Sequence, residues 1–277
     1  MICLKHILNF YINSSIHVAI AVFSLSYMTL LEFNISYDKA VLYFIFYATI
    51  TGYNFVKYFE VAKFQHRSLS KWLRLIQIFS LICFVFMGYY SFNLEKITII
   101  YIAVFAILTF LYTIPFIPKR KFLNKQSNLR NISGLKVFLI ALVWVGVTVF
   151  IPLQNNHFSM DTMVVIVSVQ RFLLVIMLML PFEIRDLQFD SLKLYTIPQN
   201  LGVKRTKILG FFLGLGMLIL EFLKQEVCIN RVLVLLTILV LTVLLIWFSR
   251  EKQGRYYAAF WVEGIPILWL LLMLVVN

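Results

Sequence analysis

The sequence predicts an all-α membrane protein that crosses the bilayer with about nine helices. Hydrophobic residues make up 62% of the 277 residues and charged residues only 13%, whereas a soluble domain is roughly half apolar and about a quarter charged. Apolar segments of about 20 residues recur along the whole chain, and each is long enough to cross the hydrocarbon core of a bilayer. We therefore treat residues 1–277 as a single membrane domain.

The expected spans follow one another with short polar connections. They lie near residues 12–33, 38–59, 71–92, 95–116, 134–154, 161–182, 207–224, 229–249 and 256–276, with the main loops near 57–72, 117–133 and 183–206. The first apolar stretch is longer than the core of a typical signal peptide, which favours a retained helix over a cleaved leader. The scattered Cys3, Cys83 and Cys228 indicate neither a disulfide framework nor a zinc site.

The distribution of basic residues predicts the orientation. Twenty of the 25 Lys and Arg residues precede the first span or lie in loops that lead from an even-numbered span to the next, and four lie on the opposite side. Because short cytoplasmic loops carry the excess of positive charge, we expect the N-terminus in the cytoplasm and the C-terminus on the other side of the bilayer. The net charge of +13 is then mostly a topology signal and gives no reason to expect nucleic-acid binding.

Three of the 12 acidic residues lie together just after the sixth span. Glu183, Asp186 and Asp190 are spaced i, i+3 and i+7, so they share one face of a helix. Three carboxylates on one face repel each other unless a cation such as Arg185, another basic loop residue or a divalent metal lies between them. Carboxylate oxygens suit Mg²⁺, which also binds phosphate oxygens. The spacing alone leaves open that the cluster is only a solvated helix end.

The residues around this cluster resemble the second acidic motif of the UbiA family of intramembrane prenyltransferases. That motif has the form DxxDxxxD, followed by a TLP-like stretch and a glycine, and here the three acids precede "YTIPQNLG". The segment "FLYTIPFIPKRKFLNKQSNLRNISGLKVF" is similar to the loop after the family's fourth span. The resemblance implies a central cavity among the helices and transfer of a polyprenyl group from its diphosphate to an unknown acceptor in the lipid bilayer.

The resemblance also implies the site residues. Glu183, Asp186 and Asp190 would hold Mg²⁺, with Asp186 and Asp190 acting in catalysis. A diphosphate leaving group carries several negative charges and needs metal ions and cations to stabilise it. The residues expected at the diphosphate are Asn54, Lys57, Lys119, Arg120, Lys136, Arg171 and Arg185. The residues alone leave open that Lys119 and Arg120 only mark topology and that Lys136 only snorkels to the membrane surface.

The family's first acidic motif, NDxxDxxxD at the end of the second span, is not kept. Asn54 matches, but its acidic positions are Phe55, Tyr58 and Ala62. Lys57 is a candidate to replace a metal ion there as a catalytic positive charge, although one ammonium supplies less charge than Mg²⁺. The interpretation is therefore a prenyltransferase, with a non-catalytic relative that binds an isoprenoid lipid as the alternative.

Arg171 falls about midway along the sixth span. A charge at this depth costs at least about 2.5 kcal/mol and marks either a functional site or an interhelical ion pair. Glu263 and Glu221 are the acidic residues expected to pair with it. Polar groups near the bilayer midplane are also typical of transporters, so a small-molecule transporter remains a third, less favoured interpretation.

Overall fold

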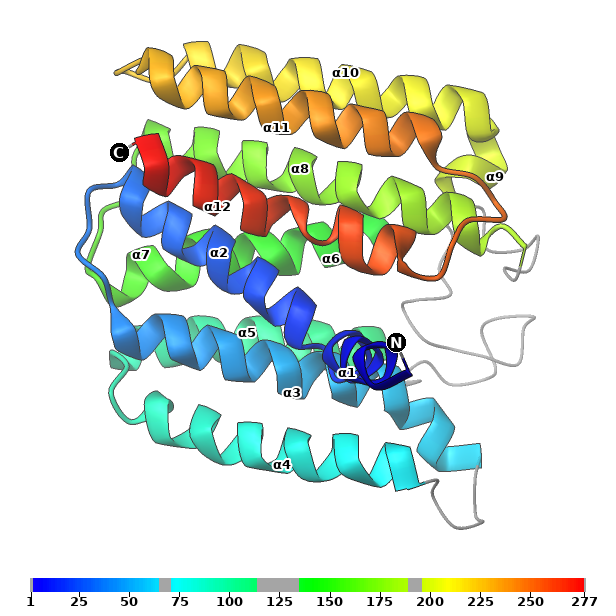
Figure 1. Ribbon diagram of the computed structural model, residues 1–277. Coiled ribbons are helices and arrows are strands. Elements are labelled where there is room, and N and C mark those ends of the chain that lie inside the picture. The colour runs from blue at the N-terminus through cyan, green and yellow to red at the C-terminus, as the bar shows by residue number, and fades with distance from the viewer. Residues whose placement is uncertain (1, 65–70, 114–134, 189–195, 277) are drawn as a thin grey trace, which may run out of the picture.

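The computed structural model describes residues 2–64, 71–113, 135–188 and 196–276, and it confirms the all-α class (Figure 1). Every regular element within these ranges is a helix. The α-helices are α1 (Ile2–Asn13), α2 (Ile16–Glu32), α3 (Lys39–Phe64), α4 (Lys71–Ser91), α5 (Lys96–Thr113), α6 (Leu135–Val145), α7 (Ile151–Asn155), α8 (Thr162–Asp186), α9 (Ile197–Leu201), α10 (Val203–Phe222), α11 (Ile229–Phe248) and α12 (Ile265–Val276). Two π-helical turns, η2 (Gly146–Phe150) and η4 (Tyr257–Val262), interrupt this series.

The number of membrane crossings is confirmed only in part. Each of the nine expected ranges contains a helix. Five spans in the described residues are long and apolar enough to cross a membrane, and a sixth is counted if the bent pair α1 and α2 forms one span. The apolar helix α5 is shorter than this length. The structure therefore supports a multi-pass membrane protein, while the count of nine remains a prediction.

The helices stack in layers with α2 and α8 at the centre. In Figure 1, α4 lies at one edge and α10 with α11 at the other. Between them α3 contacts α2, α2 contacts α12, and α12 contacts α11, while α8 contacts α10 and α11. Helices α2 and α8 are apolar on most sides, and such helices are stable only when they are covered all round. Their side chains Leu25, Leu30, Leu174 and Met177 are fully buried. The outer helix α4 instead exposes large apolar side chains, as expected for a surface that faces lipid.

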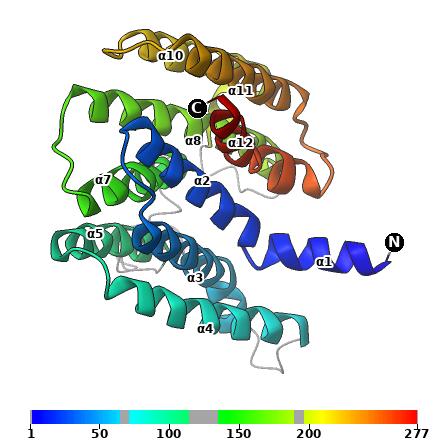
Figure 2. The same ribbon diagram turned by 60° about the vertical axis from the view of Figure 1, so that its left-hand side comes forward.

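Helix α1 departs from the bundle. It meets α2 at an angle of 57°, and Ser15 at the corner has the left-handed φ of 63°. Figure 1 views α1 end-on, and Figure 2 shows it projecting sideways from the other helices. The corner leaves carbonyl oxygens at the end of α1 without the hydrogen bonds that a continuous helix would give them. Side chains from elsewhere must therefore supply donors at this corner.

The bundle has two chemically different ends. We call the end where α8 finishes at Asp186 and η4 begins the acidic end, and the other the opposite end. At the opposite end Asp38 accepts hydrogen bonds from Asn155 at 2.7 Å and from Asn156 at 3.1 Å, which joins the α2–α3 and α7–α8 connections. Asp161 caps α8 there by accepting from the backbone N–H of Val164 at 2.9 Å. These contacts fix the start of α8, and the rigid helix then positions its other end.

Candidate functional site

The last turn of α8 carries the described part of the acidic cluster. Glu183 is buried with 1% of its side chain exposed, and Asp186 is partly exposed at 24%. Lys136, in the first turn of α6, places its Nζ 2.8 Å from Glu183 Oε1 and 3.9 Å from Asp186 Oδ2. The structure therefore brings Lys136 together with two carboxylates that lie 47 and 50 positions further along the chain, and all three residues were expected in the site.

Arg185 lies beside the same carboxylates. Its Nε donates to Asp186 Oδ1 at 2.8 Å, and its Nη2 is 2.8 Å from the same oxygen. The guanidinium also lies over the ring of Phe182 at 5.2 Å, where a cation–π contact helps to hold it. Arg185 is thus positioned by its own helix, whereas Lys136 comes from a different one.

The two cations offset the two described carboxylates. A buried carboxylate such as Glu183 is costly unless it is paired and hydrogen-bonded. Lys136 supplies that pairing in the absence of any ligand. An arriving diphosphate would offer Lys136 and Arg185 a second anion, and their ammonium and guanidinium groups are the usual phosphate-binding groups of proteins. This end of the bundle is therefore chemically suited to a phosphorylated molecule.

The described residues fit Mg²⁺ only together with phosphate oxygens. Mg²⁺ is commonly held by one or two carboxylates plus substrate phosphates, and Glu183 with Asp186 supplies such a pair. Among the described residues no group of three or more His, Cys, Asp or Glu side chains is arranged to hold a metal ion alone. Asp190, the third expected ligand, lies outside the described residues, as do Lys119 and Arg120. The metal assignment therefore stays a prediction.

The end of α3 holds the corner between α1 and α2. Asn54 donates from Nδ2 to Ser14 O at 3.1 Å and accepts from Ser15 Oγ at 2.8 Å. Lys57 Nζ and Tyr58 Oη both donate to the Asn13 carbonyl, at 3.3 Å and 2.9 Å. Carbonyl oxygens at a helix C-terminus need donors and repel carboxylates. This contact gives a physical reason for Tyr58 at one of the acidic positions of the motif that the sequence resembles, and for Lys57 next to it.

This contact predicts a loss of stability when Asn54 is truncated. Asn54→Ala removes two buried hydrogen bonds and leaves the Ser14 carbonyl and the Ser15 hydroxyl without them. We expect the free energy of unfolding to fall by about 1–3 kcal/mol. Thermal unfolding in detergent measures this change. Asn93→Ala, at an exposed position, is the matched control, and an equal shift in both variants would contradict the assigned role.

Arg171 lies away from the acidic cluster. It precedes Asp186 by 15 residues on the same helix, which corresponds to about 22 Å along the axis. Its Nη2 donates to Thr29 Oγ1 at 3.2 Å, the charge of Glu32 acts on it, and it lies 5.7 Å from the ring of Trp269. The expected pairing with Glu263 or Glu221 does not form among the described residues: the side-chain hydrogen bond of Arg171 is to Thr29, and Glu221 pairs with Lys224. Arg171 therefore does not share a ligand head group with Asp186.

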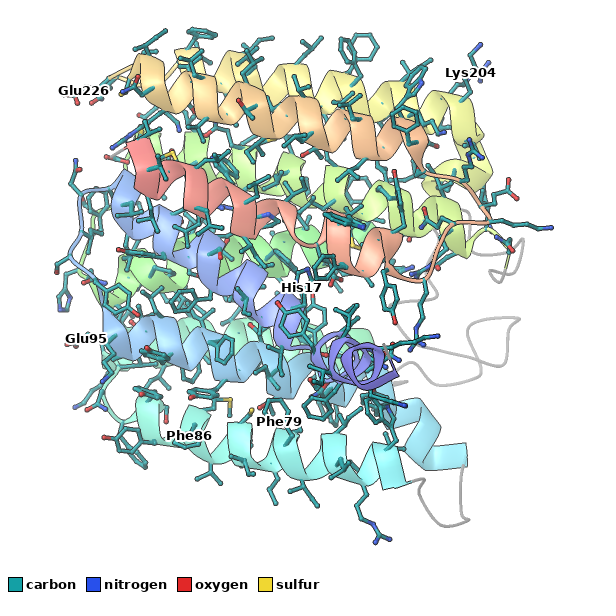
Figure 3. The ribbon with its side chains drawn as sticks, in the orientation of Figure 1. His17, Phe79, Phe86, Glu95, Lys204 and Glu226 are labelled. Carbon is teal, nitrogen blue, oxygen red and sulfur yellow. The ribbon has the colours of Figure 1, made fainter. Side chains whose placement is uncertain are left out.

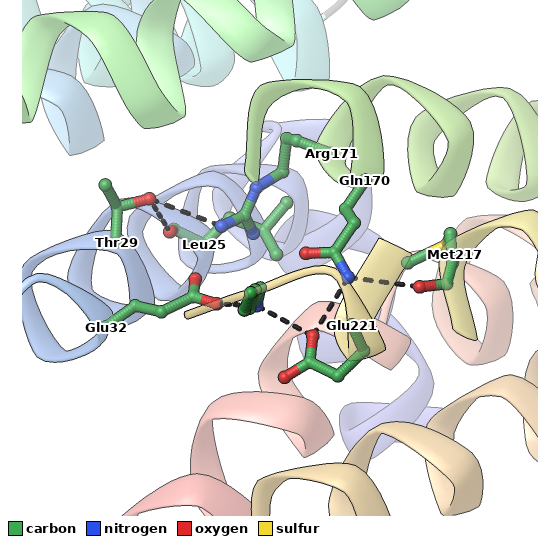
Figure 4. A network of polar contacts seen from close by, with 8 residues as sticks. Leu25, Thr29, Glu32, Gln170, Arg171, Met217 and Glu221 are labelled. Atoms are coloured by element: carbon green, nitrogen blue, oxygen red, sulfur yellow. Dashed lines mark hydrogen bonds and ion pairs between the residues drawn. The ribbon is translucent and has the colours of Figure 1, made fainter. Parts of the chain in front are cut away.

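The neighbours of Arg171 form a buried polar network at the opposite end, shown in Figure 4. Lys224 bridges Glu32 and Glu221, with 2.7 Å from its Nζ to Glu221 Oε2. Gln170 donates to the same Glu221 oxygen at 2.9 Å. Lys224 and Glu221 are both buried, and buried charges are costly unless they are paired in this way. The network ties α2, α8 and the end of α10 together.

The expected pairing of Glu263 with Arg171 is wrong. Glu263 lies between η4 and α12, where it follows the last residue of η4. The sequence does mark this position as unusual, because an acidic residue inside an apolar span is followed by Gly264 and Pro266.

Comparison with known proteins identifies the fold. No protein-family model and no curated protein matches the chain. The apo structure of a UbiA homolog from Aeropyrum pernix K1 matches with a TM-score of 0.64 and 14% identity over 94% of this chain and 98% of that one. A structure described as digeranylgeranylglyceryl phosphate synthase matches with a TM-score of 0.56 and 16% identity over 98% of both chains. At these identities the likeness establishes the fold, and it confirms at that level the resemblance expected from the motifs.

Proposed function

We propose that this chain, which has the fold of UbiA homologs, is an intramembrane prenyltransferase that moves a polyprenyl group from its diphosphate to an acceptor. The observation that carries the proposal is the convergence of Glu183, Asp186, Lys136 and Arg185 at one end of the bundle, with ion-pair distances of 2.8 Å. The two fold neighbours support it, because one is a UbiA homolog and the other is described as a synthase of digeranylgeranylglyceryl phosphate.

The charged side chains have distinct tasks in this proposal. Lys136 and Arg185 bind the diphosphate and orient it toward the apolar interior of the bundle. Mg²⁺, when bound with Asp186 and Glu183, would supply positive charge to the leaving diphosphate. The bond between C1 of the prenyl group and its oxygen breaks, and the electron pair leaves with the diphosphate. The apolar helices exclude water from the allylic carbon, which protects it from hydrolysis.

The proposed orientation places the acidic end in the cytoplasm. Figure 3 shows Lys204 at the acidic end and Glu95 and Glu226 at the opposite end. The excess of basic residues at the acidic end is the pattern of cytoplasmic loops. Since the two termini lie at different ends in Figure 1, the N-terminus is cytoplasmic and the C-terminus is on the other side. Diphosphates made in the cytoplasm would then have direct access to the site.

A non-catalytic isoprenoid-binding protein is the second candidate. The observation that favours it is the use of Asn54, Lys57 and Tyr58 to hold α1, which leaves the first acidic motif without a described carboxylate. Such a protein binds the polyprenyl diphosphate and does not release pyrophosphate. Binding of the polyprenyl diphosphate and release of pyrophosphate are therefore measured separately.

The test uses the full chain in lipid nanodiscs with farnesyl and geranylgeranyl diphosphate. We expect Mg²⁺-dependent binding that inorganic pyrophosphate competes away, together with slow release of pyrophosphate. Mass spectrometry of lipids that copurify with the chain would then reveal isoprenoids. Equal binding in EDTA contradicts the metal assignment, binding without release supports the second candidate, and the absence of binding rejects the prenyltransferase.

A further inference from the structure

Helix α1 carries its polar and apolar residues on different faces. Lys5, His6 and Asn9 are spaced i, i+1 and i+4, so they share one face, and Ile7 with Tyr11 lies on another. Ile7 is 60% exposed, and Lys5 and His6 are exposed as well. At 12 residues α1 is too short to cross a bilayer by itself. A short amphipathic helix of this kind is stable where a surface covers its apolar face.

Helix α1 runs across the membrane spans rather than along them. Figure 1 shows α1 end-on, whereas α3 and α4 extend across the same view, and Figure 2 shows α1 projecting sideways to the N-terminus. Helix α4 contains the span Trp72–Ser91, which is long and apolar enough to cross the bilayer. A helix that lies across such a span runs along the plane of the membrane. This is the orientation of interfacial amphipathic helices.

The contacts of Phe10 fix the depth of α1. Its ring centroid lies 5.7 Å from that of Trp72 and 5.7 Å from that of Phe79, both on α4. Trp72 is the first residue of the span, and tryptophan is typical of the membrane–water interface. Phe79 lies about 10 Å further along α4, so Phe10 reaches the first two turns of the span. In these turns α4 exposes Leu75, at 56%. The apolar face of α1 therefore adjoins the lipid-facing surface of α4.

The polar face of α1 lies next to basic residues. Asn9 Oδ1 accepts a hydrogen bond from Tyr256 Oη at 2.7 Å, and Tyr256 directly precedes the last span. The guanidinium of Arg255 lies 5.9 Å from the Tyr256 ring, and Arg255 is exposed. Lys5 lies about one turn before Asn9 on the same face. The connection 249–256 has three basic residues and one acidic residue, so its charge suits an anionic surface.

We propose that α1 is an interfacial helix that binds anionic phospholipids at the acidic end of the bundle. Ile7 inserts among the acyl chains beside α4, and Lys5 and Arg255 bind the lipid phosphate groups. The proposed orientation places this end at the cytoplasmic leaflet, where anionic lipids attract basic residues next to a span. The lipid contact does not depend on the proposed transferase chemistry, because it uses neither the acidic cluster nor the cations that face it.

The lipid contact also acts on the corner between α1 and α2. The Asn13 carbonyl at the end of α1 accepts from Lys57 Nζ at 3.3 Å and from Tyr58 Oη at 2.9 Å. A phospholipid that holds α1 in place therefore also holds the end of α3. Since a ligand that binds only the folded state stabilises it, we expect anionic lipid to raise the unfolding temperature of the chain.

The first experiment measures the depth of α1 in nanodiscs of phosphatidylglycerol and phosphatidylcholine. A spin label is attached to Ile7→Cys in the full chain after Cys3, Cys83 and Cys228 are replaced by alanine, and His6→Cys is the matched control on the polar face. We expect the Ile7 label to collide mainly with oxygen, which concentrates in the bilayer, and the His6 label to collide mainly with a water-soluble nickel chelate. Frequent collisions of the Ile7 label with the chelate would place α1 in water and overturn the proposal. An Ile7 label that neither reagent reaches would overturn it as well, because protein would then cover this face.

The second experiment measures the lipid preference. Phosphatidylglycerol or phosphatidylcholine is added to the detergent-purified chain, and the rise in unfolding temperature gives the apparent affinity of each lipid. We expect tighter binding of phosphatidylglycerol, and an affinity about fivefold lower in Lys5→Gln, since one cation near an anionic surface contributes about this factor. Lys5→Arg keeps the charge and should keep the affinity. Lys96→Gln removes an exposed cation at the opposite end and should leave the affinity unchanged.

Two results would overturn the assignment of Lys5 to lipid phosphate. Equal stabilisation by the two lipids would show that the chain does not select the anionic head group. Equal losses of affinity in Lys5→Gln and Lys96→Gln would show that phosphatidylglycerol responds only to the total charge of the chain.

Discussion

Asp186→Ala is expected to slow Mg²⁺-dependent release of pyrophosphate by about 100- to 1000-fold. This is the usual effect of removing one group that stabilises charge in a transition state. Asp186 is the more exposed of the two described carboxylates, and it contacts both expected phosphate-binding cations, Arg185 and Lys136. Its loss would remove one metal ligand and also the group that orients Arg185. Mg²⁺-dependent binding of farnesyl diphosphate should be lost in the same variant.

Asp161→Ala is the matched control for this prediction. Asp161 is the same residue type next to the same helix, but it caps α8 at the opposite end. Its loss should lower the free energy of unfolding by about 1 kcal/mol and leave pyrophosphate release unchanged. Equal rates in Asp186→Ala and the wild type would place the chemistry elsewhere. Equal losses of rate in the two alanine variants would show that α8 is merely destabilised.

The overall fold could be predicted because the bilayer imposes a simple rule. A span needs about 20 apolar residues whatever packs against it, so the expected ranges 71–92, 161–182 and 229–249 closely match α4, α8 and α11. An interruption that depends on tertiary contacts could not be predicted. The turn at Gly146–Phe150 is an example: Gly146 lies so close to the Phe105 ring that a Cβ would come within 2.1 Å.

The candidate site also has a part that the sequence predicts and a part that it does not. The i, i+3 spacing of Glu183 and Asp186 is local, so the sequence alone places both on one helix face. The partners of Asn54 and Lys136 are distant in the chain, and no local pattern specifies them. Asn54 binds Ser14 and Ser15 about 40 positions away, and Lys136 pairs with Glu183 47 positions away. Long-range pairs of this kind require the packed structure.

Lys136→Met is expected to lower the free energy of unfolding by about 3–5 kcal/mol. The variant removes the ammonium that lies 2.8 Å from the buried Glu183, and breaking one side of a buried ion pair has an effect of this size. Lys207→Met is the matched control, because Lys207 makes an exposed hydrogen bond to Trp247 O at 2.7 Å and no ion pair with a described residue. Thermal unfolding in detergent should show a much smaller shift for the control than for Lys136→Met.

A double variant distinguishes loss of the Lys136–Glu183 ion pair from general destabilisation of the fold. Lys136→Met combined with Glu183→Leu removes both charges, and replacing a buried pair with apolar residues is often neutral. Its stability should therefore return close to that of the wild type. Loss of stability in the double variant equal to the sum of the two single losses would mean that Lys136 and Glu183 do not interact.

Mg²⁺ links this ion pair to the proposed activity. Under the proposed function Mg²⁺ would bind the Glu183 and Asp186 carboxylates, which Lys136 contacts in the wild type, and Lys136→Met would remove that competitor. Since a ligand stabilises the folded state more when it binds that state more tightly, Mg²⁺ alone should raise the unfolding temperature of Lys136→Met more than that of the wild type. Equal shifts would show that Mg²⁺ does not use these carboxylates. A larger shift in the variant would support a model in which Mg²⁺ displaces Lys136 from the carboxylates. The Lys136 ammonium would then be available to bind the diphosphate.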